Sequence, residues 1–140
     1  MIDILLVEDS PTDAELTQQA FRESKLLNNI AHVKDGVEAL AYLRRQGQYA
    51  ESRIPHLILL DLNLPQKNGK EVLIEIKSDP EFRDIPVVIL TSSDDEGDIL
   101  GSYKHYANCY ITKPVGFEKL VSVVTQIQSF WFNVVVLPPR

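Results

Sequence analysis

The central apolar run of this chain, residues 57–60, is the strongest indication of its fold in the sequence. Its sequence, Leu-Ile-Leu-Leu, has no polar interruption, whereas a strand with one face in water alternates between apolar and polar side chains. Such a run predicts a strand that helices cover on both faces, as in a parallel sheet. Asp61 follows at once, and Pro65 and the turn-forming pair Asn68 and Gly69 then end the extended segment.

Two interpretations of Asp61 remain open from this stretch alone. Open α/β sheets bind ligands at the carboxyl ends of their strands, which is where Asp61 is predicted to lie. Asp is also a common turn residue, so the same carboxylate would serve equally well as a loop cap. The choice between these two interpretations depends on which residues follow the other predicted strands.

Polar residues end other predicted strands in the same way. Residues 4–7 form a second apolar run, which ends in Glu8 and Asp9, and residues 87–90 form a third, which ends in Thr91. Because the carboxyl ends of parallel strands meet at one edge of a sheet, we expect these polar groups to lie near Asp61.

The remaining elements complete a regular alternation of strands and helices. Weaker strands are predicted at 30–33 and 109–112, and a polar surface loop at 46–53. Apolar residues at helical spacing, with capping residues and Gly or Pro at the ends, predict helices at about 10–24, 37–45, 69–79, 95–106 and 117–127. Strand and helix alternate five times, which predicts right-handed crossovers and a doubly wound five-stranded parallel sheet between two helical layers, the flavodoxin-like fold.

Length and charge exclude several classes of protein. The 140 residues fit one domain, which we expect at 1–130, with an apolar tail at 131–140. The net charge of −6 argues against a nucleic-acid-binding surface. No apolar run is long enough to cross a membrane, and the amino terminus does not resemble a signal peptide, so the cytoplasm is the expected compartment. The single cysteine, Cys109, is too little for an internal disulfide or a zinc site.

The polar strand ends form a chemically coherent set. The carboxylates of Glu8, Asp9 and Asp61 would repel one another in a partly buried site, so they need a cation, and Mg²⁺ prefers such oxygen ligands. Lys113, directly after the last predicted strand, adds a positive charge, and the Thr91 hydroxyl can donate to an oxyanion. Together these groups predict phosphoryl transfer to Asp61, which would become an aspartyl phosphate. Each residue alone is equally well explained as an ordinary polar strand end or turn.

Four separated stretches of the chain resemble the receiver domain of two-component response regulators. They are residues 7–9, 60–69, 87–91 and 110–114, and the resemblance extends over residues 2–130. Within that family the chain is most similar to the stand-alone response regulators of cyanobacterial phytochromes. This narrower resemblance rests on residues 62–65, 76–80, 46–53 and 129–131.

The resemblance implies a role for each acidic strand end. Asp61 would accept the phosphoryl group from the phosphohistidine of a sensor histidine kinase, and a phytochrome is the kinase that the narrower resemblance implies. Glu8, Asp9, Asp61 and the backbone carbonyl of Asn63 would hold Mg²⁺. Glu8 departs from the family pattern, in which many members have Asp, and its longer side chain favours metal ligation through water.

The resemblance also assigns the remaining strand ends. Thr91 and Lys113 would bind the phosphoryl oxygens, and Tyr110 would be an aromatic switch whose ring turns inward on activation. An aromatic residue near a strand end often only packs, so this simpler interpretation of Tyr110 stays open. The expected protein is a phosphoacceptor switch and not an enzyme, with at most weak self-phosphorylation and autodephosphorylation.

The run of mostly apolar residues at 130–137 is expected to be buried against another surface and not exposed to water. They could fold back on the last helix, dock on the kinase or pair with a second copy. We expect a homodimer through the last helix and the tail.

Three other functions fit parts of the pattern. A phosphohydrolase with an Asp nucleophile usually has an Asp-x-Asp pair, whereas Asn63 stands two residues after Asp61. A flavin-binding electron carrier would need a phosphate loop after the first strand, where Glu8 and Asp9 would repel the phosphate. A receiver-like docking module that is never phosphorylated is disfavoured by the complete set of acids and lysine.

Overall fold

The computed structural model describes residues 2–23, 27–91 and 109–112, together with residues 122, 125 and 126. Its five strands form one sheet in the order β2-β1-β3-β4-β5, and every neighbouring pair is parallel. The strands are β1 (Ile2–Val7), β2 (Asn28–Val33), β3 (Leu57–Leu60), β4 (Val87–Thr91) and β5 (Cys109–Thr112). This strand order is that of the flavodoxin-like doubly wound fold, as the sequence predicts.

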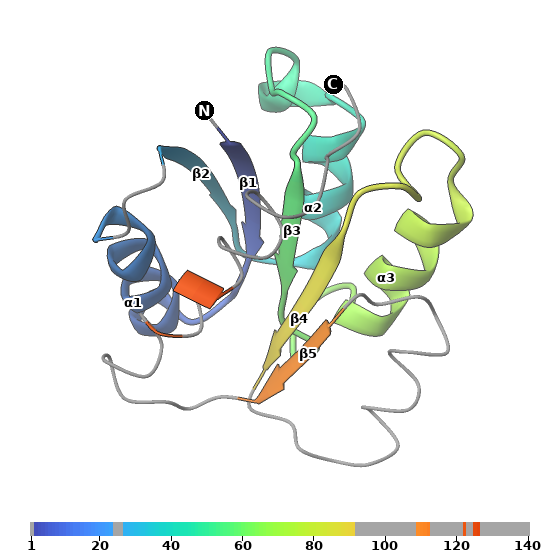
Figure 1. Ribbon diagram of the computed structural model, residues 1–140. Coiled ribbons are helices and arrows are strands. Elements are labelled where there is room, and N and C mark those ends of the chain that lie inside the picture. The colour runs from blue at the N-terminus through green and yellow to red at the C-terminus, as the bar shows by residue number, and fades with distance from the viewer. Residues whose placement is uncertain (1, 24–26, 92–108, 113–121, 123–124, 127–140) are drawn as a thin grey trace.

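Helices cover both faces of the sheet (Figure 1). The described helices are α1 (Pro11–Arg22), α2 (Gly36–Leu43) and α3 (Gly69–Ser78). α1 packs on one face of the sheet through Ala14, Ala20 and Phe21, whereas α2 and α3 pack on the other. None of the described helices is long and apolar enough to span a membrane.

The apolar run of β3 contributes to both layers of the core. Leu57 and Leu59 belong to the core cluster on the α1 face, and Ile58 and Leu60 belong to the cluster on the α2 and α3 face. All four side chains are at most 1% exposed. Because successive side chains of a strand point to opposite faces, only a run without polar residues fits this position.

A side-chain cap begins each of the three described helices. The Ser10 hydroxyl accepts a hydrogen bond from the Asp13 amide at 3.2 Å, and the Asp35 and Asn68 side chains accept from residues three positions later. These caps satisfy backbone donors that have no partner inside the helix. They also fix where the chain turns at the carboxyl edge of the sheet.

The predicted boundaries agree with the structure within about two residues wherever the chain is described. The predicted loop at 46–53 contains a short 3-10 helix, η1 (Gly47–Tyr49), whose Tyr49 ring packs edge-on against Tyr42 with ring centroids 5.4 Å apart. The helix predicted at 95–106, nearly all of the helix predicted at 117–127 and the tail at 131–140 lie outside the described residues.

Candidate functional site

The acidic strand ends predicted from the sequence meet at the carboxyl edge of the sheet. Val7, the last residue of β1, is paired with Leu60, the last residue of β3, and the Asp61 amide donates to the Val7 carbonyl at 3.1 Å. Glu8, Asp9 and Asp61 follow directly. One carboxylate oxygen of each lies within 4.8 Å of those of the other two.

The three carboxylates differ in exposure. Glu8 and Asp61 are only 2% and 5% exposed, whereas Asp9 is exposed. Two buried carboxylates at this distance are costly to keep ionised without a cation. Three carboxylate oxygens that converge on one point suit a hard divalent ion, and the exposed Asp9 leaves the cluster open to solvent. The donor set therefore fits Mg²⁺ or a similar cation.

The loop from β3 to α3 closes tightly behind Asp61. The Asn63 amide donates to Asp61 Oδ1 at 2.9 Å, and the Gly69 amide donates to the Leu62 carbonyl at 3.0 Å. A Cβ on Gly69 would lie 2.2 Å from the Asp61 carbonyl oxygen, a separation that real Cβ atoms do not reach. These contacts fix the backbone of Asp61 and one of its carboxylate oxygens. The predicted role of the Asn63 carbonyl as a metal ligand stays a prediction.

The Glu8 peptide is held by its neighbours on several sides. Its amide donates to the Val33 carbonyl at 3.0 Å, and its Oε2 accepts a hydrogen bond from the Ser10 amide at 3.3 Å. Its carbonyl oxygen lies 2.7 Å from Nε2 of His32 on β2. Glu8 is thus fixed by β2 and by the residues that lead into α1.

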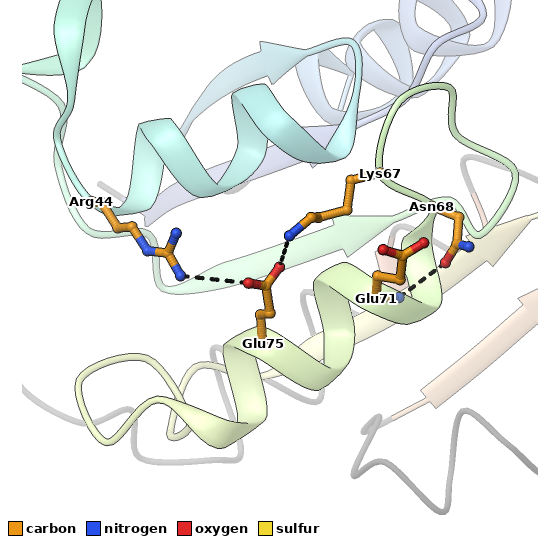
Figure 2. A network of polar contacts seen from close by, with 5 residues as sticks. All are labelled: Arg44, Lys67, Asn68, Glu71 and Glu75. Atoms are coloured by element: carbon orange, nitrogen blue, oxygen red, sulfur yellow. Dashed lines mark hydrogen bonds and ion pairs between the residues drawn. The ribbon is translucent and has the colours of Figure 1, made fainter.

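A polar network anchors the far end of the loop that carries Asp61 (Figure 2). Lys67 and Arg44 both contact the Glu75 carboxylate on α3, Arg44 at 3.9 Å. The Lys67 carbonyl also packs against α2, where a Cβ on Gly36 would lie 2.2 Å from it. Gln66, just before, has a φ of 65°, in the left-handed region. The loop is therefore tied to both α2 and α3.

The backbone brings the other predicted strand ends to the same edge. Thr91 is the last residue of β4 and is paired with Thr112, the last residue of β5, while Tyr110 is paired with Ile89. β4 lies directly beside β3. Lys113, the next residue after Thr112, lies outside the described residues.

The sequence alone did not single out two groups near the site. His32 stands in an edge strand without a recognisable motif, and its contact with Glu8 depends on the register of β1 and β2. Glu75 reaches Lys67 and Arg44 because of how α2 and α3 pack. The alternation of side chains along residues 28–33 could have placed His32 at the carboxyl edge, but not its partner.

Known proteins resemble this chain in sequence and in fold. The family model for the response regulator receiver domain matches residues 4–125. The chain is 47% identical over 135 residues to response regulator Rcp1 of Synechocystis sp., covering 96% of this chain and 92% of that protein. It is 41% identical over 130 residues to the probable methanogenesis regulatory protein FilR2 of Methanothrix harundinacea, covering 93% of this chain and 83% of that protein.

Solved structures match nearly the whole chain. The phosphorylated cyanobacterial phytochrome response regulator RcpA has a TM-score of 0.92 and 48% identity, and 99% of each chain is covered. The Mn²⁺-bound form of response regulator Rcp1 has a TM-score of 0.91 and 46% identity, covering 99% of this chain and 100% of that one. The resemblance read from the sequence motifs is thereby confirmed.

Proposed function

This chain belongs to the family of two-component response regulators with a receiver domain, and from that membership we propose that Asp61 is its phosphoacceptor. The observation that carries the proposal is the convergence of Glu8, Asp9 and Asp61 at the carboxyl edge of the sheet. Asp61 is the member of this set that follows the central strand β3. Its Oδ1 is already oriented by the Asn63 amide.

The proposed reaction is phosphoryl transfer from a phosphohistidine of a sensor histidine kinase. A carboxylate oxygen of Asp61 forms a bond to phosphorus, the bond between phosphorus and the histidine nitrogen breaks, and the imidazole leaves with its electron pair. Glu8, Asp9, Asp61 and the Asn63 carbonyl would hold Mg²⁺. When bound, the cation would supply positive charge for the carboxylates and the phosphoryl oxygens.

Three further residues complete the proposed switch. Thr91 and Lys113 bind phosphoryl oxygens, and Tyr110 changes its position on activation. The pairing of Thr91 with the end of β5 supports this assignment, since it brings residues from both strands to the edge that carries Asp61. Phosphorylation would then shift a pre-existing equilibrium between two states, as in other regulated proteins.

The partners proposed are a phytochrome-type sensor kinase and a second copy of this chain. The similarity to the RcpA phytochrome response regulator supports the first. The apolar residues of the tail, 131–140, support the second, with the receiver domain ending near residue 130. We place the protein in the cytoplasm, where such kinases present their phosphohistidine. Sedimentation of the full chain and of a chain ending at residue 130, over a series of concentrations, tests the dimer: self-association only in the full chain is expected.

The test of the central proposal is intact-protein mass spectrometry after incubation with acetyl phosphate and Mg²⁺. We expect one added phosphoryl group in the native chain, and none in Asp61→Asn or after chelation with EDTA. Asp84→Asn, which removes an exposed carboxylate elsewhere, is the matched control and should be phosphorylated normally. If no sample gains mass, the domain is a docking module that is not phosphorylated. Phosphorylation that persists in Asp61→Asn would place the acceptor elsewhere.

A further inference from the structure

His32 is near the end of β2 and reaches the acidic strand end of the neighbouring β1. It is paired in register with Leu6, which belongs to the core cluster on the α1 face. Ile30, two residues earlier in β2, packs against the same cluster. Side chains two residues apart point to the same face of a strand, so the His32 ring lies on the α1 side of the sheet. From there its Nε2 is 2.7 Å from the Glu8 carbonyl oxygen.

The direction of this hydrogen bond follows from the atoms involved. A carbonyl oxygen only accepts, so Nε2 of His32 carries the hydrogen and donates it. The separation of 2.7 Å is at the short end of the range for such bonds. The neutral ring protonated on Nε2 and the doubly protonated ring both meet this requirement. The contact therefore does not depend on the charge of the histidine.

The position of His32 explains why the Glu8 carbonyl accepts a hydrogen bond from a side chain and not from a backbone amide. The pairing of β1 with β2 ends at Val7 and Val33, and the Glu8 amide donates to the Val33 carbonyl just beyond that pair. β2 then leaves the sheet, and Asp35 serves as the N-cap of α2. The His32 ring thus supplies a donor to the Glu8 carbonyl at the point where the regular ladder of backbone bonds ends.

We propose that His32 is a positioning residue for the divalent-metal site. By holding the Glu8 carbonyl it fixes the peptide group between Glu8 and Asp9, and with it the directions in which both carboxylates leave the backbone. His32 acts only through this peptide group. The inference rests on the proposed metal site formed by Glu8, Asp9 and Asp61.

The test is calorimetric titration of the full-length protein with Mg²⁺. His32→Leu removes the donor and keeps an apolar side chain of moderate size, whereas the Gln side chain of His32→Gln reaches a similar distance and donates from its amide. We expect the dissociation constant of Mg²⁺ to rise about tenfold in His32→Leu and to stay within about threefold of the native value in His32→Gln. His32→Met, which also lacks a donor, replaces His32→Leu if the latter does not fold.

The matched control is His56→Leu. His56 accepts a hydrogen bond from the Asp3 amide at 3.1 Å, at the amino-terminal edge of the sheet and so at the opposite edge from the metal site. The His56→Leu variant therefore tests whether the loss of any histidine hydrogen bond lowers Mg²⁺ affinity. We expect a lower stability in EDTA for this variant with unchanged Mg²⁺ affinity. Native affinity in His32→Leu, equal losses in His32→Leu and His32→Gln, or an equal loss in His56→Leu would each overturn the assignment. If the native chain binds no Mg²⁺, the metal site itself is wrong, and the role of His32 is wrong with it.

Discussion

Gly69 and Asp61 approach each other more closely than any side chain at position 69 would permit. A Cβ on Gly69 would lie 2.2 Å from the Asp61 carbonyl oxygen and 2.5 Å from the Leu62 Cα. The Gly69 amide closes the same loop by donating to the Leu62 carbonyl. Both clashing atoms belong to the backbone, so no side-chain rotation can relieve them. Gly69 is therefore required for steric reasons directly behind the proposed phosphoacceptor.

Gly69→Ala should lower both stability and phosphorylation. The added methyl group forces the backbone at Asp61 and Leu62 to move, and overpacking of this kind costs about 1–3 kcal/mol. Because the movement displaces Asp61, the rate of acyl-phosphate formation with acetyl phosphate should fall as well. Urea denaturation and intact-mass time courses measure the two effects.

Gly47→Ala is the control for that prediction. Gly47 has a φ of +57°, but no atom would lie within 4 Å of an added Cβ. Its substitution should cost about 1 kcal/mol through backbone strain and leave phosphorylation unchanged. A Gly69→Ala protein with native stability and a native phosphorylation rate would contradict the close approach.

Ser10→Ala should lower the stability of the protein without changing its affinity for Mg²⁺. The Ser10 hydroxyl caps α1, whereas its amide donates to Glu8 Oε2 at 3.3 Å, and Ala keeps that amide. Loss of an N-cap costs about 1 kcal/mol, so the thermal midpoint should fall while Mg²⁺ affinity stays native. Ser10→Thr, which keeps the hydroxyl, should have nearly native stability. Weaker Mg²⁺ binding in Ser10→Ala would mean that the hydroxyl itself serves the site.

The strand ends could be predicted from the sequence because each depends on a local pattern. Apolar runs predicted β1, β3 and β4. The parallel arrangement that these runs imply brings Glu8, Asp9 and Asp61 together. β2 was predicted two residues too short. It is an edge strand, and Asn28 and Asn29 pair with β1 through the backbone although their side chains are polar. An edge strand of this kind needs no apolar signal at its start.

Contacts between distant residues could not be predicted in this way. The bond from His32 to the Glu8 carbonyl depends on the relative register of two strands, and a shift of one residue would turn the ring to the other face. The unequal burial of Asp9 and Asp61 depends on how the loops close over the edge. The steric need for Gly36 beside the Lys67 carbonyl depends on the docking of α2 against the loop after β3. Tertiary packing determines all three.

Glu75 should couple unequally to its two basic partners. The Lys67 contact is the closer one, with side chains 29% and 35% exposed, whereas Arg44 is 3.9 Å away and 41% exposed. Double-mutant cycles with Lys67→Met, Arg44→Met and Glu75→Gln measure the coupling free energy of each pair. We expect about 0.5–1 kcal/mol between Glu75 and Lys67 and close to zero between Glu75 and Arg44.

The measurement is urea denaturation of each single and double variant at low and high salt. The Lys67 coupling should decrease as salt screens the pair. A coupling for Arg44 equal to that for Lys67, or one that salt leaves unchanged, would contradict the geometry in Figure 2.

Lys77 should make stability depend on pH in the alkaline range. Its Nζ donates to the carbonyl oxygens of Arg83 at 3.0 Å and Ile85 at 2.7 Å, which holds the segment before β4 against α3. Burial lowers the pKa of the Lys77 ammonium, and the nearby Asp84 carboxylate opposes that shift. The unfolded chain therefore keeps this proton to a higher pH than the folded chain does. The contribution of Lys77 to stability should then rise as the pH increases from the folded pKa toward the unfolded value of about 10.4.

Lys77→Met removes both this dependence and the two hydrogen bonds. Because a neutral amine still has two N–H donors, the native contacts persist as the proton leaves. The free energy of unfolding of the native chain minus that of Lys77→Met should thus increase as the pH rises from neutral toward about 10, as measured by urea denaturation at each pH. The exposed Lys34, replaced in Lys34→Met, should give a difference that changes little over that range. A constant difference for Lys77→Met would contradict this prediction, because it would mean that Asp84 and the two carbonyl acceptors fully offset the effect of burial on the Lys77 ammonium.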